Sequence, residues 1–346
     1  MDVLLGKTLT ELQEVAMTVG LPKFAGKQLA EWLYVRRVKS FDEMTNISLN
    51  GREALKAAYT IGRHDPIREA VSQDGTRKYL FQVSGFRFQV SQVEQQFVES
   101  VYIPEDDRAT LCVSTQAGCK MGCRFCMTGT LGFHGQLSAA EILNQVFYFD
   151  DLTNVVLMGE GEPMDNIDNV LRALEILTAD YACAWSPKRI TVSSVGVIPG
   201  LKRFIEESDC HLAISLHNPF ADERVAIMPI QKAYPIADVI TLLKQYDWAH
   251  QRRVSFEYIC WGGQNDTPRH AKELVRLLRG LPCRVNLIRF HEGVERDFKA
   301  SNENAMIWLR DYLTANGVTT TIRKSRGEDI LAACGMLVNA LSANSH

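Results

Sequence analysis

The 346-residue sequence contains no apolar run near the ~18–20 residues that a membrane-spanning helix requires. Its opening residues carry acidic side chains where a secretory signal peptide carries basic ones. Internal repeats and low-complexity stretches are absent, and 46% hydrophobic with 23% charged residues excludes a disordered, collagenous or fibrous chain. We therefore expect a soluble cytoplasmic protein that has no membrane partner.

A large charge imbalance is also absent, because 38 Lys and Arg residues face 41 Asp and Glu residues, for a net charge of −3. This excludes a protein that coats nucleic acid by bulk charge, since such binding depends on neutralised phosphates. A local basic groove is still compatible with it. The nine cysteines are odd in number and unevenly spaced, which favours metal or redox chemistry over a disulfide scaffold.

The chain divides into three parts by pattern. Residues 1–64 predict a slightly basic helical module, with a capping box at Thr8–Glu11 and a second helix over 25–36. Residues 65–107 predict a small antiparallel β extension or linker, because three short strand-like runs at 78–84, 85–90 and 99–104 are separated by turn residues. Residues 108–346 form the predicted main domain.

In the main domain, strand and helix patterns alternate. The predicted strands are 110–114, 154–158, 189–193, 211–216, 254–259 and 285–289; the predicted helices are 139–148, 167–177, 236–245, 268–278 and 304–315. Six repeats favour an α/β fold in which an open, partial (β/α)6 barrel has its helices outside, rather than a closed eight-fold barrel. We expect the chemistry at the C-terminal ends of the strands.

The strongest motif is Cys119-Lys-Met-Gly-Cys123-Arg-Phe-Cys126, just after the first predicted barrel strand. Three thiolates at this spacing on a glycine-containing loop suit three corners of a [4Fe-4S] cluster and leave one iron open. Zinc is the main competitor, but a structural zinc site generally takes four protein ligands and no second pair lies nearby. Simple packing of three cysteines gives no reason for the spacing.

This loop resembles the Cys-x3-Cys-x2-Cys motif of radical S-adenosylmethionine (SAM) enzymes, with Phe125 as the aromatic residue before the last cysteine. The resemblance implies that the open iron binds SAM and that reductive cleavage yields a 5′-deoxyadenosyl radical. The stretch Gly159-Glu-Gly-Glu-Pro163 resembles the SAM-contacting Gly-Gly-Glu-Pro motif. The implied SAM contacts at strand ends are Gly161, Glu162, Ser193, Ser215, Leu216 and His217. Taken alone, each of these stretches also fits a turn or a strand-end cap.

Longer motifs resemble the RlmN/Cfr family of radical SAM RNA methyltransferases. They are Val101–Arg108, Thr110–Cys119, Arg323–Ile330 with Ala332-Ala-Cys-Gly335, and Gly26–Tyr34 in the helical module. The resemblance covers the whole chain. It implies methylation of carbon 2 of an adenosine in 23S rRNA and in tRNA, with residues 1–64 as an RNA-binding module.

The resemblance assigns roles to three further residues. Cys334 would take a methyl group from one SAM molecule, and a second SAM would supply the radical that removes hydrogen from this methyl, so that two SAM are used per turnover. Glu99 corresponds to a proton acceptor. Cys112 would resolve the thioether to RNA through a disulfide with Cys334. From the residues alone, Cys112 in an apolar strand is also compatible with packing.

Two positions depart from the family pattern. His291 stands where many relatives have an asparagine that contacts SAM, and we expect its imidazole to take that role. The cluster loop continues with Met127 where relatives have a smaller residue. Neither change affects the three cluster cysteines.

The expected partners are RNA and an external electron donor such as flavodoxin or ferredoxin, with the chain as a monomer. Candidate RNA contacts are basic residues of the N-terminal module and of the barrel rim: Lys23, Lys27, Arg36, Arg37, Lys39, Lys188, Arg189, Arg323, Lys324 and Arg326. Two alternatives stay open. One is a Cfr-like enzyme that methylates carbon 8 and confers antibiotic resistance, and the other is an iron–sulfur redox protein without SAM chemistry.

Overall fold

The computed structural model describes residues 1–83, 96–248, 254–291, 297–333 and 335–337. The strand expected at 85–90 and the predicted methyl carrier Cys334 lie outside the described residues.

The N-terminal module is helical, as predicted. It contains α1 (Leu9–Thr18), α2 (Ala25–Ala30) with a π-helical continuation (Glu31–Val35), and α3 (Leu49–Ala58). The predicted capping box starts α1: the backbone N–H of Thr8 donates to the Glu11 carboxylate at 2.7 Å, and the Thr8 hydroxyl accepts from the backbone N–H of Glu11 at 3.4 Å. Two short parallel strands, β1 (Asp2–Val3) and β2 (Tyr59–Thr60), join the two ends of the module.

The main domain is built on one ten-stranded sheet with the order β14-β13-β12-β11-β10-β9-β6-β5-β4-β3. Seven neighbouring strands are parallel: β6 (Arg108–Cys112), β9 (Asn154–Leu157), β10 (Ile190–Ser194), β11 (His211–Ser215), β12 (Val254–Cys260), β13 (Cys283–Arg289) and β14 (Thr319–Ile322). All six predicted strands are present. Strand β14 was not predicted, because a short threonine-rich edge strand has little hydrophobic patterning.

The antiparallel strands continue the barrel sheet instead of forming a separate one. They are β3 (Arg68–Val71), β4 (Arg77–Val83) and β5 (Gln96–Glu105). The link is β5, which pairs with β6 and places Val101 opposite Cys112. Consecutive β5 residues from Val98 to Val101 are buried, so both faces of this strand are covered. Such burial explains why the extension cannot stand apart from the barrel.

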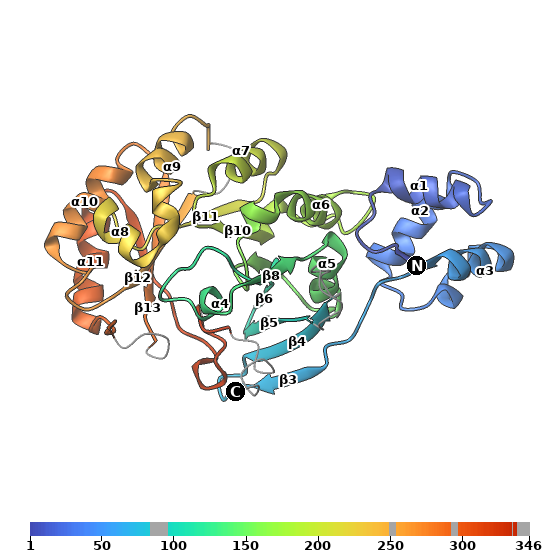
Figure 1. Cartoon of the computed structure of the whole chain (residues 1–346), viewed down its shortest axis with the longest axis horizontal. Helices are drawn as coiled ribbons and strands as arrows, with labels where there is room; N and C mark the ends of the chain where they lie inside the picture. Colours follow the sequence, from blue (N-terminus) through green and yellow to red (C-terminus); the bar gives the residue numbers. More distant parts are fainter. Residues whose placement is uncertain (84–95, 249–253, 292–296, 334, 338–346) are drawn as a thin grey trace.

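Helices follow the parallel strands around the outside of the sheet (Figure 1). They are α5 (Ala139–Phe147), α6 (Ile167–Thr178), α7 (Ile198–Glu207), α8 (Ala221–Ile227), α9 (Ile236–Leu243), α10 (Pro268–Leu278) and α11 (Glu303–Ala315). The two ends of the sheet order, β14 and β3, are not paired with each other, so the barrel is open as predicted. Within the described ranges, no helix has the length and apolarity needed to cross a membrane.

The N-terminal module is attached to α5 and α6 by part-buried polar contacts, and Figure 1 shows it beside these two helices. The amide of Asn144 on α5 accepts from the backbone N–H of His64 and donates to its carbonyl, both at 2.9 Å. Arg63 donates to the Phe147 carbonyl at 2.6 Å, and Arg172 on α6 binds the Glu11 carboxylate at 2.6 Å. The module is therefore held to the barrel and does not hang from a free linker.

We expect Asn144→Ala to lower the free energy of unfolding by about 1–3 kcal/mol, because two part-buried hydrogen bonds between the buried Asn144 side chain and the His64 backbone are lost. Urea titration followed by circular dichroism measures this change. The control is Asn50→Ala, an exposed position on α3. Equal transition midpoints for the two variants would show that the Asn144 contact does not hold the module.

Candidate functional site

The three predicted cluster cysteines lie on one loop that is closed by a small ribbon. Strands β7 (Gln116–Gly118) and β8 (Phe133–Gln136) pair on either side of the loop, and the backbone N–H of Cys119 donates to the Gly132 carbonyl at 2.8 Å. Gly118 has a φ of +68°, and a Cβ there would lie 2.0 Å from the Gly132 oxygen. Glycine is therefore required where the loop starts.

The thiols of Cys119, Cys123 and Cys126 lie near enough to one another to interact electrostatically. Burial raises the pKa of all three, that of Cys119 to about 12, and the neighbouring thiols raise the pKa of Cys119 and Cys123 further. Such thiols become thiolate ligands only when a cationic centre binds them. In the described part of the chain, no three His, Cys, Asp or Glu side chains are arranged around a single metal ion. The fit to an iron–sulfur cluster with an open iron therefore rests on the spacing of three cysteines on one loop.

A buried arginine that was not predicted from the sequence binds the carbonyl groups at the ends of two strands near this loop. Arg224 on α8 has no exposed surface and donates to the carbonyls of Val195, Ser215 and Leu216, each at 3.0 Å. Burial lowers its pKa to about 10, so it is charged at neutral pH, and it interacts electrostatically with Cys123. Nothing in the sequence distinguishes Arg224 from a surface arginine on a polar helix.

The predicted Gly-Glu-Pro stretch follows β9. Gly161 has a φ of +96°, and a Cβ would lie 2.4–2.8 Å from Gln116 atoms, so a side chain is excluded. The carboxylate of Glu162 accepts from the backbone N–H groups of Met164 at 3.0 Å and Val195 at 2.9 Å. Burial raises the pKa of Glu162 to about 7. Glu162 thus connects the ends of β9 and β10 at the mouth of the barrel.

Glu160 is a second buried carboxyl group that the sequence analysis did not select. It is 1% exposed and accepts from the backbone N–H of Glu99 at 2.8 Å. Burial raises its pKa to about 8. Ser114 donates to the Glu99 carbonyl at 2.6 Å and accepts from the Glu160 N–H at 2.8 Å. The backbone around Glu99 is therefore fixed to the loop after β9.

Three of the other predicted SAM contacts lie at the ends of β10 and β11. Ser193 lies in β10 in register with Ala213 of β11, and Ser215 is the last residue of β11. The carbonyls of Ser215 and Leu216 are the ones that Arg224 binds. The structure therefore places these residues together at the C-terminal ends of neighbouring strands, as expected for a parallel sheet.

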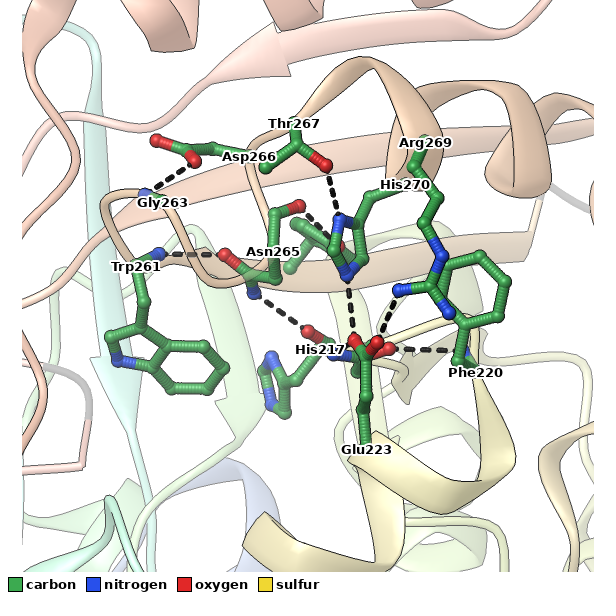
Figure 2. A network of polar contacts seen from close by, with 12 residues as sticks. His217, Phe220, Glu223, Trp261, Gly263, Asn265, Asp266, Thr267, Arg269 and His270 are labelled. Atoms are coloured by element: carbon green, nitrogen blue, oxygen red, sulfur yellow. Dashed lines mark hydrogen bonds and ion pairs between the residues drawn. The ribbon is translucent and has the colours of Figure 1, made fainter.

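His217 has a left-handed backbone, with φ of +53°, that its neighbours hold (Figure 2). Its Nδ1 accepts from the Ile259 N–H at 3.1 Å, and its carbonyl accepts from the Asn265 side chain at 2.8 Å. Burial lowers its pKa to about 3, so the imidazole is neutral. The Phe125 ring lies 4.8 Å from the His217 ring, which brings the cysteine loop against this strand end.

Asn265 and Glu223 organise the network around His217 (Figure 2). Asn265 is 1% exposed, donates to the Ile259 carbonyl and accepts from the Trp261 N–H, both at 2.7 Å. Glu223 accepts from Asn218 at 2.9 Å and contacts His270 at 2.7 Å. Burial opposes ionisation of Glu223, but hydrogen bonds from Arg269, His270 and Asn218 lower its pKa to about 2. Asn265 thus fixes the backbone of His217, and Glu223 holds the next residue, Asn218.

His291 lies against the C-terminal segment. Its Nε2 is 2.7 Å from the Ser325 hydroxyl, and its Nδ1 is 3.4 Å from the Glu328 carboxylate. The structure thus gives both ring nitrogens protein partners, and the role of His291 as a SAM contact stays a prediction.

Cys112 and Glu99 lie on adjacent strands inside the barrel. Cys112 packs against a small apolar cluster of Val101, Ala332 and Leu337. Val101 lies on β5, whereas Ala332 and Leu337 flank position 334 in the sequence. The carbonyl of Gly335 accepts from the Met127 N–H in the cysteine loop at 2.8 Å. The residues that flank Cys334 therefore contact both Cys112 and the cysteine loop. Glu99 is 2% exposed and lies 3.0 Å from Lys78, which the sequence analysis did not select.

The basic residues predicted to contact RNA are distributed over several surfaces. Lys23 and Lys27 are exposed at the start of α2, whereas Lys39 pairs with Asp65 at 2.6 Å. Near the starts of β6 and β9, a cavity of about 810 Å³ is lined by both signs of charge: Asp74, Glu105, Asp106, Asp107, Arg108, Arg189, Lys324 and Arg326. This cavity is not a uniformly basic groove.

Family models match two parts of the chain. The model described as the radical SAM superfamily matches residues 113–278. The model described as the ribosomal RNA large subunit methyltransferase N-terminal domain matches residues 3–61.

Curated relatives match over almost the whole chain. A "Probable dual-specificity RNA methyltransferase RlmN" of Bacteroides fragilis is 57% identical, covering 99% of this chain and 98% of the relative. A "Dual-specificity RNA methyltransferase RlmN" of Marinobacter nauticus is 41% identical, covering 97% and 92%. The crystal structure of a radical SAM methyltransferase from Sphaerobacter thermophilus is 36% identical, covers 97% of this chain and 99% of that one, and superposes with a TM-score of 0.88. By its cysteine loop, its open barrel and these full-length matches, the chain belongs to the RlmN family of radical SAM RNA methyltransferases.

Proposed function

We propose that this enzyme methylates carbon 2 of an adenosine in 23S rRNA and in tRNA through S-methylcysteine at Cys334. The observation that carries the proposal is the convergence of three segments inside the barrel. Residues flanking Cys334 contact Cys112 on β6 and the cysteine loop at Met127, and Glu99 lies on the adjacent strand. A methyl carrier, a resolving thiol and a proton acceptor are thus provided close to the cluster loop.

Cys119, Cys123 and Cys126 would hold the [4Fe-4S] cluster, which reductively cleaves SAM when both are bound. The SAM-binding edge is formed by Gly161, Glu162, Ser193, Ser215, Leu216 and His217, with His291 as a further contact. The neutral imidazole of His217 and the buried carboxyl of Glu162 provide fixed polar groups there. Two SAM molecules serve each turnover, one as the methyl source and one as the radical source.

The chain's own residues then complete the transfer. Cys334 carries the methyl group and forms a covalent thioether to the adenine through that carbon. Glu99 accepts the ring proton. The Cys112 thiolate attacks the Cys334 sulfur and breaks its bond to the methylene carbon, which leaves with the electron pair and takes up a proton to complete the methyl group, so that the methylated base is released and a Cys112–Cys334 disulfide forms. The target adenine must leave its stack to reach Cys334 and the cysteine loop.

We assign RNA binding to the module of residues 1–64, the β extension to 65–107 and catalysis to 108–346. The docking of the module onto α5 and α6 supports this assignment, because it fixes the module relative to the barrel. The enzyme would act in the cytoplasm as a monomer, with flavodoxin or ferredoxin as the electron donor. Family membership as an RNA methyltransferase disfavours the redox protein without SAM chemistry.

Mass spectrometry of 23S rRNA and tRNA from a strain that lacks this gene tests the target atom. We expect loss of 2-methyladenosine from both RNAs and its return when the gene is restored. Loss of 8-methyladenosine instead would support the carbon-8 alternative and overturn the proposal.

We expect Cys119→Ala, Cys123→Ala and Cys126→Ala each to abolish the cluster, because the loop offers three thiols and no spare one. Iron and sulfide content of anaerobically purified protein measures this. Cys210→Ala is the matched control, since Cys210 is also buried but lies just before β11, outside this loop. A ligand variant with the iron content of the control would remove that cysteine from the set.

We expect Cys112→Ala to keep the cluster and the methyl mark on Cys334 but to stall with RNA bound covalently, because no thiolate releases the thioether. Denaturing gel electrophoresis should show slow-migrating, nuclease-sensitive protein, and Cys334→Ala should lack both the mark and the adduct. If Cys112 only packs, alanine costs about 1 kcal/mol of stability and turnover continues. An active Cys112→Ala variant free of RNA would contradict its proposed role.

A further inference from the structure

The hairpin formed by β3 and β4 binds the C-terminal segment that leads to Cys334 through hydrogen bonds. The carboxylate of Asp74, in the turn, accepts from the Gly327 N–H at 3.0 Å. Ser72 donates to one oxygen of the Asp329 carboxylate at 2.5 Å, and the Gln73 N–H donates to the other at 3.1 Å. A Cβ on Gly327 would lie 2.9 Å from the Thr76 methyl group, so the two chains are in close contact. Residues classed as an extension therefore hold a catalytic segment in place.

Lys78 joins this hairpin to the proposed proton acceptor. Its ammonium lies 3.0 Å from the Glu99 Oε1 and donates to the Leu331 carbonyl at 3.3 Å. The side chains of Lys78 and Glu99 are only 11% and 3% exposed. An ion pair this sheltered cannot be broken on one side without leaving a buried charge.

The strand register places the ion pair on the face that holds Cys112. Lys78 is opposite Val101, and Val101 is opposite Cys112. Directly opposite residues of antiparallel strands share a face, and Glu99 shares it with Val101 because the two are two residues apart. Lys78, Glu99 and Cys112 therefore lie on the same face of the sheet.

The contact with Leu331 falls where the backbone is strained. Leu331 has a φ of +53°, and it closes a turn in which the Ala332 N–H donates to the Gly327 carbonyl at 2.8 Å. A left-handed conformation is costly for leucine and needs support from its surroundings. The ammonium of Lys78 gives that support three residues before Cys334.

We propose that Lys78 is a positioning residue that holds the Glu99 carboxylate and the backbone leading to Cys334 against each other. The inference rests on the proposed function for the roles of Glu99 and Cys334. Lys78 sets their relative position, so that proton acceptor and methyl carrier meet one adenine ring. Glu99 also interacts with the buried carboxyl group of Glu160, which accepts from its backbone N–H.

The first test needs neither cluster nor SAM. We compare hydrogen exchange of the peptide spanning residues 327–337 in cluster-free Lys78→Met, Lys78→Arg and Arg77→Met. Arg77 is the neighbouring residue of β4, more than half exposed and paired with Glu69, so it serves as the control. We expect at least tenfold faster exchange in Lys78→Met and near-normal exchange in the other two variants, because arginine keeps a cation in place.

The second test follows RNA methylation as a function of pH in the reconstituted enzyme. Without the adjacent cation, the pKa of a carboxylate rises by about 1–3 units, so the rising limb of the rate profile should move to higher pH in Lys78→Met. At neutral pH we expect a rate at least tenfold below wild type, largely restored by Lys78→Arg. Cluster content should equal that of Arg77→Met.

Unchanged exchange together with an unshifted pH limb in Lys78→Met would overturn the proposal. A general loss of rate that Lys78→Arg does not restore, with the limb unmoved, would show a purely structural role and overturn it too. If the wild-type enzyme produced no methyladenosine, the proposed function would fail, whereas the exchange result would still decide whether Lys78 holds the segment.

Discussion

The geometry of the site depends on how the open barrel is bridged. The strand order leaves β14 at one edge and the β3–β4 hairpin at the other, and the C-terminal segment crosses between them. At its start the Arg323 N–H donates to the Leu287 carbonyl, and farther on Gly327 and Asp329 bind the hairpin turn. Because the C-terminal segment ends against β5, β6 and the cysteine loop, it brings residues from both ends of the main domain together.

Buried polar groups fix the loops at the C-terminal ends of the parallel strands. Arg224, Glu160, Glu162 and Asn265 are each almost completely buried, and each forms hydrogen bonds to the backbone of other segments. Burying such groups is costly unless their hydrogen bonds are satisfied. Each satisfied group in turn restricts the loops it binds to one arrangement. The loops after β9, β10, β11 and β12 are thereby held together at the C-terminal ends of the parallel strands, where a cofactor can contact all of them.

The N-terminal module adds a second level of order. Its contacts to α5 and α6 join backbone carbonyls and buried amides instead of exposed charges alone. In its proposed role in RNA binding, a fixed module would give a folded RNA a defined distance between its point of contact and the cysteine loop. Such recognition by shape would require less net positive charge, which is compatible with a chain of net charge −3.

The sequence by itself determined the cysteine loop, the six main barrel strands and the helical module, because ligand spacing and hydrophobic period are local properties. It also placed Glu162 and His217 after strands, where the ends of parallel strands must meet. Only the tertiary structure decided the roles of Arg224, Glu160, Asn265 and Lys78. Each is an ordinary polar residue in its own segment, and its partners lie on other elements, up to 253 residues away for Lys78 and Leu331. Long-range pairing of this kind leaves no periodic or spacing signal in the chain, so folding alone brings it about.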